Sequence, residues 1–281
     1  MTDISFDPWH RQLASLLARW WTPLLLCCLV VAAAIVADSY ARIVYPGTPG
    51  VIAALIKWTP LILFGPPGQM GGFVLNIFIS LLSMTIGTVT GVLLGIAQIS
   101  PRPSIKYPAF LATQFFRNSP WLVLLYFAMF LLPFELRIFR IAMPFPDWIK
   151  ATIGLALPVM ANISEVTRGA IQSIPTAQWE ATMSLGLSGR QTLTLVILPQ
   201  CVRRAMPLWM NWYAILMMST PLVSIVGVND AMTLVQDALA SEQRSELLVP
   251  IYLWLLFWFG LYCYPIARCT QLIERRFAVG T

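Results

Sequence analysis

The sequence predicts an all-α protein that crosses a membrane with about six helices. Its 281 residues are 58% hydrophobic and only 11% charged, whereas a soluble domain carries about 25% charge. So few charges cannot coat a soluble surface of this size, and apolar runs of membrane-spanning length recur along the chain. Lipid must therefore replace water over much of the surface, and the spanning segments must be helices.

The first expected span is Trp20–Ala37. We interpret it as a retained anchor, because no small-residue cleavage site of a signal peptide accompanies it. Val51–Phe64 is apolar but short, and Lys57 and Pro60 interrupt it, so it is expected to be interfacial or re-entrant. The other five spans are expected at Phe73–Ile99, Tyr107–Leu132, Trp148–Ile171, Ala205–Val228 and Leu247–Arg268. Residues 117–120 are expected to break the span Tyr107–Leu132 and free backbone groups that could line a polar path.

Two organising features follow from these spans. Residues 1–70 would hold a cytoplasmic segment, an extra helix and an external interfacial piece, and residues 71–277 the core. Gly87, Gly91 and Gly95 recur every four residues, a stripe of small residues that favours close helix packing.

The distribution of Lys and Arg predicts that both termini are cytoplasmic. With that orientation, eleven basic residues lie inside and six outside, and Arg117 lies within the membrane. Asp230, Asp237, Glu242 and Glu246 then cluster outside. The net charge of +6 is modest and does not indicate a nucleic-acid partner.

A polar loop at residues 173–204 is the main interruption of the apolar pattern. Pro175 suits the first turn of a helix, which would place Trp179, Met183 and Leu187 on one face. A turn would follow, then a second short helix that Pro199 ends. Such a helix pair could dock into a groove on a soluble partner, where Glu180 would meet an arginine, or it could lie on lipid.

The same loop resembles the EAA motif of the permeases of ATP-binding cassette (ABC) importers. Glu180-Ala181-Thr182, then Gly186, then Val196-Ile197-Leu198-Pro199 fall at that motif's spacings, and Thr182 and Val196 are mild departures. Residues 165–175 resemble the Glu-x-x-Arg-Gly-Ala-Ile-x-x-Ile-Pro run of the polar amino acid (histidine-type) permeases. Residues 116–120 resemble that family's Phe-Arg-Gly-Thr-Pro run.

The resemblance implies a type I ABC importer permease fold with a cytoplasmic coupling-helix loop in the bacterial inner membrane. The expected ATPase contacts are Trp179, Glu180, Ala181, Met183, Gly186 and Leu187. The implied partners are an ATPase dimer that binds the ATP and Mg, a second identical or paralogous permease chain, and an external binding protein. That binding protein would deliver a polar amino acid or a derivative of one.

No enzymatic activity is expected of this chain. Its three lysines, Lys57, Lys106 and Lys150, each follow isoleucine, so a Gly-Lys-Ser/Thr phosphate loop is impossible. His10 is the only histidine, which argues against a histidine-rich metal site. An ion-gradient-driven transporter or channel is the alternative function, but it predicts paired acids and an inverted repeat that the sequence does not show.

Polar residues within the spans are the candidates for a substrate path, because they are costly in lipid. Glu165 could bind a substrate cation, or it could pair with Arg117 or Arg168. Asn162 could contact the ligand or another helix, and it stands where many family members carry tyrosine. The full candidate set is Arg117, Asn118, Ser119, Asn162, Glu165, Ser219 and Thr220.

Overall fold

The computed structural model describes residues 30, 32–33, 35–40, 50–138 and 141–278. The larger elements are α2 (Val51–Phe64), α3 (Gly72–Gln98), α4 (Pro103–Asn118), α5 (Trp121–Leu131), α6 (Asp147–Gln172), α7 (Thr176–Ser184), α9 (Leu198–Ser219), α10 (Ala231–Glu242) and α11 (Leu248–Ala278). The short ones are β1 (Glu135–Ile138), β2 (Ile141–Pro144), α8 (Gly189–Gln191), the π-helix η1 (Thr192–Ile197) and the 3-10 helices η2 (Thr220–Val226) and η3 (Ser245–Leu247).

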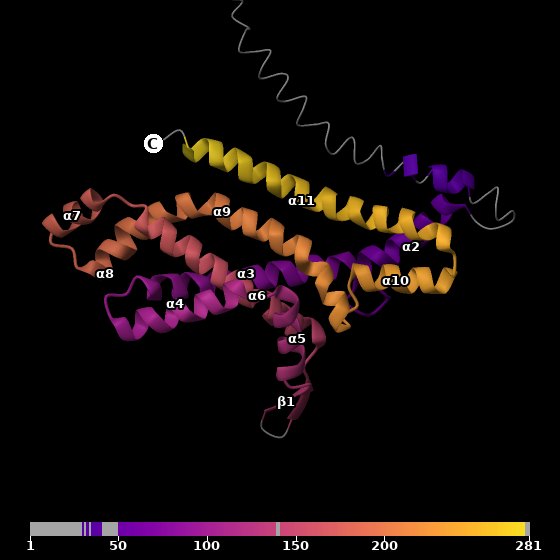
Figure 1. The fold of residues 1–281 in the computed structure, drawn as a ribbon, viewed down its shortest axis with the longest axis horizontal. Coiled ribbons are helices and arrows are strands. Elements are labelled where there is room, and N and C mark those ends of the chain that lie inside the picture. The colour runs from indigo at the N-terminus through magenta and orange to yellow at the C-terminus, as the bar shows by residue number, and fades with distance from the viewer. Residues whose placement is uncertain (1–29, 31, 34, 41–49, 139–140, 279–281) are drawn as a thin grey trace, which may run out of the picture.

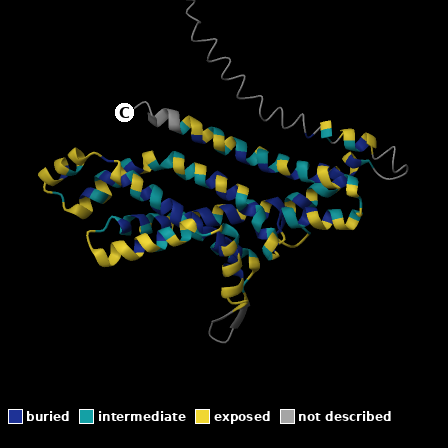
Figure 2. Ribbon diagram, in the orientation of Figure 1, coloured by how far each residue is buried: buried dark blue, intermediate teal, exposed yellow. Residues whose placement is uncertain are grey.

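Helices α3 and α6 form the centre of the bundle (Figures 1 and 2). Their contact depends on the predicted glycine stripe. A Cβ atom on Gly87 would lie 2.5 Å from Val159 Cγ1, and one on Gly91 would lie 2.6 Å from the Met160 carbonyl oxygen. Gly95 is equally close to the Ser164 carbonyl oxygen. The absence of side chains therefore brings the two backbones together, and the predicted role of these glycines in packing is confirmed.

Four stretches in the described part of the chain are long and apolar enough to cross a membrane: Gly72–Gln98, Asp147–Gln172, Gly189–Val226 and Ser245–Ile273. They correspond to four of the six expected spans. The expected first span, Trp20–Ala37, lies mostly outside the described residues. Val51–Phe64 forms a helix of 14 residues, which is too short to cross, as expected.

The break expected at residues 117–120 of the span Tyr107–Leu132 is confirmed, but neither resulting helix is among the four stretches long enough to cross a membrane. The chain makes two helices there, and α5 projects away from the bundle at a steep angle to α4 (Figure 1). Ser119 and Pro120 separate them with extended backbone. Proline has no N–H to donate, and it favours extended conformations at the preceding residue, which agrees with the end of the helix at this point.

The expectation of a purely helical chain needs one correction. Strands β1 and β2 pair antiparallel beyond the end of α5, with Glu135 opposite Pro144 and Ile138 opposite Ile141. The hairpin leads the chain back into α6, and its residues lie at the projecting end of the molecule (Figure 1).

The expectation that Pro199 ends a short helix is also wrong. The π-helix η1 continues directly into α9, so one helical stretch runs over Gly189–Val226. Pro199 falls in the first turn of α9, and the N–H of Leu198 reaches back to the Leu193 carbonyl. Pro199 has no N–H to donate, and the wider π turn before it shifts the hydrogen bonds by one residue, so the helix continues without a break.

Helices α2 and α10 pack at the end of the bundle opposite α7, along the first half of α11 (Figure 1). Val51, Ala54 and Leu55 from α2 are buried against Val235 and Ala238 of α10. Lys57 Nζ lies 2.7 Å from Glu242 Oε1, and the Trp58 indole donates to the same oxygen. The apolar contacts and this ion pair together attach α2 to the core.

Candidate functional site

The loop between α6 and α9 projects from one end of the bundle as the pair α7 and α8 (Figure 1). Helix α7 begins directly after Pro175, as predicted, and ends at Ser184; Gly186, two residues on, has a left-handed φ of +73°. Two hydrogen bonds close this end, from the Gly186 N–H to Met183 and from the Leu187 N–H to Thr182. This is a Schellman motif, and it explains why glycine is needed at this position.

The predicted apolar face of α7 is wrong in its grouping. Trp179 is half-buried and packs toward the protein's own Ile171, Ile174, Ile197 and Cys201, whereas Met183 is 65% exposed. Leu187 lies past the end of the helix, so helical spacing does not extend to it. The outward apolar residues are Met183 and Leu185, of which Leu185 is 79% exposed.

Glu180 and Ala181 are exposed on α7, as is Met183. The loop therefore offers a carboxylate and apolar side chains together on its outer surface. The α8 end is rigid as well, since the Ser188 and Gln191 side chains form a reciprocal capping box with the backbone.

Arg204 on α9 secures the base of this loop. Its guanidinium donates to the Ser173 carbonyl oxygen at 2.7 Å and to the Ser173 hydroxyl at 3.1 Å. Ser173 ends α6, so Arg204 satisfies a carbonyl group that the helix leaves unpaired and connects α6 to α9. Sequence reasoning assigned Arg204 only to the inner positive charge and did not predict this contact, because the two residues are 31 positions apart.

Glu165 lies in an ion-pair cluster on α6. Arg168 holds its carboxylate with two nitrogens, at 2.6 Å and 3.3 Å, and Arg117 Nη1 from α4 lies 3.6 Å away. The Glu165 side chain is 14% exposed, but that of Arg117 is 47% exposed. Both pairings that the sequence left open are therefore present, and the cluster presents an exposed guanidinium next to a compensated carboxylate.

Three other candidates from the predicted path lie near this cluster along α4 and α6. Asn118 is exposed, and its amide donates to the Gln114 carbonyl oxygen. Ser119 is half-buried, and its hydroxyl donates to the Phe115 carbonyl oxygen. Asn162 is buried and donates to the Pro158 carbonyl oxygen at 2.8 Å. The Asn162 side chain thus binds a carbonyl of its own helix, which neither of its predicted roles included.

Thr220 is not on an accessible surface. It is fully buried and accepts a hydrogen bond from Asn76, which also donates to Asp230 and accepts from the Ala231 N–H. This buried network joins α3 to the start of α10, and sequence reasoning missed it. Ser219 is half-buried and donates to the carbonyl oxygen of Ile215.

Nothing in the described part of the chain groups three or more histidine, cysteine or carboxylate side chains as metal ligands would be grouped. The described features are therefore a rigid projecting loop, an arginine–glutamate cluster within the helices, and polar networks between helices.

Residues 87–279 match the family described as binding-protein-dependent transport system inner membrane component. The chain is 28% identical to the inner membrane amino-acid ABC transporter permease protein YhdY of Escherichia coli over 75% of its length, which covers 57% of that relative. It is 31% identical to the probable amino-acid ABC transporter permease protein YckA of Bacillus subtilis, over 79% of the chain and 97% of the relative.

The fold is shared with two solved transporters. A crystal structure of an amino acid ABC transporter with histidines matches 82% of this chain and 99% of that chain, with a TM-score of 0.64 at 22% identity. The MetNI methionine ABC transporter in an inward-facing conformation matches 71% of this chain and 93% of that chain, with a TM-score of 0.56 at 16% identity. The expected ABC importer permease fold is therefore confirmed, and this multi-pass chain belongs to the family of binding-protein-dependent transport system inner membrane components.

Proposed function

We propose that this chain forms part of the translocation path of an ATP-driven importer for a polar amino acid or an amino-acid derivative. Family membership supports the transport role, and the relatives YhdY and YckA are described as amino-acid permeases. The L-cystine permease TcyB of Bacillus subtilis, 30% identical over 75% of the chain, supports the same substrate class. An external binding protein would deliver the substrate, and a second permease chain would complete the path.

The observation that carries the coupling role is the outer surface of α7. Glu180, Met183 and Leu185 are exposed there; a Schellman motif closes the end of α7, and Arg204 secures the base of the loop at Ser173. A rigid element of this kind transmits a displacement without bending. A separate ATPase dimer, which binds the ATP and Mg, would press on this surface, and the loop and both termini would face the cytoplasm.

The substrate would pass the cluster at Glu165. Arg117 is the exposed cation of that cluster and would meet a carboxylate of the substrate, while Glu165 stays paired with Arg168. Asn118 and Ser119 lie next to Arg117 at the break between α4 and α5. Asn162, Ser219 and Thr220 would influence the shape of the path indirectly, by fixing the backbone of the helices that carry them.

The test of coupling compares Glu180→Lys with Gln178→Lys, which adds a charge at another exposed position of the same helix. The assay is ATP-dependent uptake of labelled amino acids into proteoliposomes that hold the whole transporter. We expect Glu180→Lys to abolish uptake and weaken retention of the ATPase, and Gln178→Lys to leave both close to wild type. Normal uptake by Glu180→Lys, or uptake driven by an ion gradient without ATP, would show that this proposal is wrong.

A further inference from the structure

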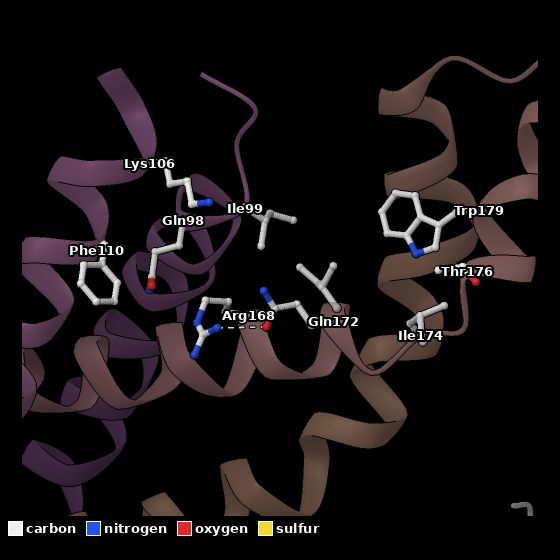
Figure 3. A pocket seen from close by; sticks show the side chains of 10 residues that line it. Gln98, Ile99, Lys106, Phe110, Arg168, Gln172, Ile174, Thr176 and Trp179 are labelled. Atoms are coloured by element: carbon white, nitrogen blue, oxygen red, sulfur yellow. Dashed lines mark hydrogen bonds between the residues drawn. The ribbon is translucent and has the colours of Figure 1, made fainter. Parts of the chain in front are cut away.

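A cavity of about 600 Å³ lies where the ends of α3 and α6 meet the starts of α4 and α7. It is distinct from the outer surface of α7 and is on the side of the bundle that carries the loop (Figure 3). Lys106, Arg168, Gln172, Thr176 and Trp179 supply its polar lining, and Gln98 its inner wall. Its volume is in the range of small-ligand sites.

The lining offers hydrogen-bond donors. Gln172 Oε1 accepts from Arg168 Nη1 at 2.9 Å, so its amide nitrogen remains for the cavity and points into it (Figure 3). The Lys106 ammonium also points inward in this view, and no ion-pair partner of Lys106 is found among the described residues. Arg168 is compensated by Glu165, so Lys106 contributes a positive charge that the cavity does not balance.

Gln98 fixes the inner wall of the cavity. It is 2% exposed, and its amide nitrogen donates to the hydroxyls of Thr113 at 2.9 Å and Ser164 at 3.2 Å. The Thr113 and Ser164 hydroxyls also lie 2.9 Å apart, so this buried network ties α3 to α4 and α6 behind the cavity.

We propose that this cavity binds the phosphate of an anionic phospholipid headgroup, such as that of phosphatidylglycerol. The phosphate oxygens accept from Lys106 and the Gln172 amide, which both point into the cavity (Figure 3). Basic pockets between helices at the cytoplasmic ends of spans suit such headgroups.

The surroundings of the cavity favour a lipid over a soluble phosphate. Phe110 lines the cavity and is 44% exposed, and the neighbouring Tyr107 and Leu111 on α4 are 64% and 66% exposed. These side chains form an apolar surface that would face acyl chains when the bundle lies in a membrane. A headgroup bound here contacts α4, α6 and α7 together, and it would brace the base of the loop.

The test uses the complete transporter in nanodiscs of phosphatidylcholine with or without phosphatidylglycerol, and native mass spectrometry counts the retained lipids. Lys106→Gln removes the charge, and Lys106→Arg keeps it. Arg102→Gln is the matched control, because Arg102 lies one turn earlier at the start of α4 and does not line the cavity. We expect Lys106→Gln to retain about fivefold less phosphatidylglycerol than Arg102→Gln, a difference of about 1 kcal/mol.

A second arm adds inorganic phosphate to the phosphatidylcholine discs and follows its binding by phosphorus NMR. Phosphate binding that only Lys106→Gln abolishes would support the site with a soluble phosphate as its source. Equal retention and equal phosphate binding by Lys106→Gln and Arg102→Gln would overturn the proposal, because only general surface charge would then be at work. Neither measurement requires transport, so a failure here differs from a failure of the proposed importer function.

Discussion

Replacement of Asn76 by leucine should destabilise the protein by about 2–6 kcal/mol. Asn76 is fully buried and makes three hydrogen bonds, to Thr220 at 3.1 Å, to Asp230 at 3.0 Å and from the Ala231 N–H at 3.0 Å. Leucine has a similar volume but no polar atoms. The change leaves Asp230 Oδ2 and the Ala231 N–H buried without this partner, and each such group costs about 1–3 kcal/mol.

The assay is reversible unfolding by denaturant in detergent micelles, followed by tryptophan fluorescence. Thr85→Val on the same helix is the control, because Thr85 is exposed and donates only to the Leu81 carbonyl of its own helix. We expect the control to change the free energy of unfolding by less than about 0.5 kcal/mol. If Asn76→Leu changed it as little as the control, the reasoning that the network holds α3 to α10 would be refuted.

Four further outcomes follow from the described contacts. Burial raises the pKa of Asp230, so the folded state takes up the proton at a higher pH than the unfolded state. The wild-type protein should therefore gain stability as the pH falls from the raised pKa to the pKa of the unfolded state. Asp230→Asn should remove this gain, which the difference between the two curves of stability against pH would show. The hydrogen bond from Lys57 lowers the pKa of Glu242, so this ion pair stabilises the fold above the ordinary pKa of 4.5 and loses its effect as the pH falls through the lowered pKa. Because Lys57 is 64% exposed, Lys57→Met should reduce the free energy of unfolding by at most about 1 kcal/mol at neutral pH. An equal loss in acid would contradict the pairing. Gly186→Ala should destabilise the end of α7 by about 1 kcal/mol, because alanine resists φ of +73°, and hydrogen exchange of the Leu187 amide should report it, with Gly189→Ala as the unstrained control. Gly91→Leu should prevent correct folding, because even a Cβ atom would lie 2.6 Å from the Met160 carbonyl oxygen; a monodisperse, active Gly91→Leu protein would show that the two helices can separate.

The sequence was sufficient for the features that depend on local pattern. Four of the long apolar runs, the four-residue spacing of Gly87, Gly91 and Gly95, and the start of α7 at Pro175 all follow from composition and helical period. Each of these is set by side chains that lie within a few turns of one another.

Features that depend on distant partners could not be predicted in this way. Thr220 was chosen for its polarity within an apolar stretch, but its partner Asn76 lies 144 positions away and turns it into a packing residue. Pro199 is equally compatible with the end of one helix and the first turn of the next, and the π-helix before it decided between them. Trp179 faces inward because Ile197 and Cys201 return to α7 from the far side of the loop.

The glycine contact between α3 and α6 also limits which parts of the molecule can move. Val159, Ile163 and Thr167 of α6 pack directly against the three glycines at successive turns of α3, and all three side chains are β-branched and stiff. Neither helix can therefore rotate or slide against the other without a clash. Glu165 and Arg168 therefore lie on a helix whose position relative to α3 is fixed, whereas Arg117 lies on α4, just before the helix break at Ser119 and Pro120. A transport cycle would then change the distance between these charges by swinging α4 past a stationary carboxylate.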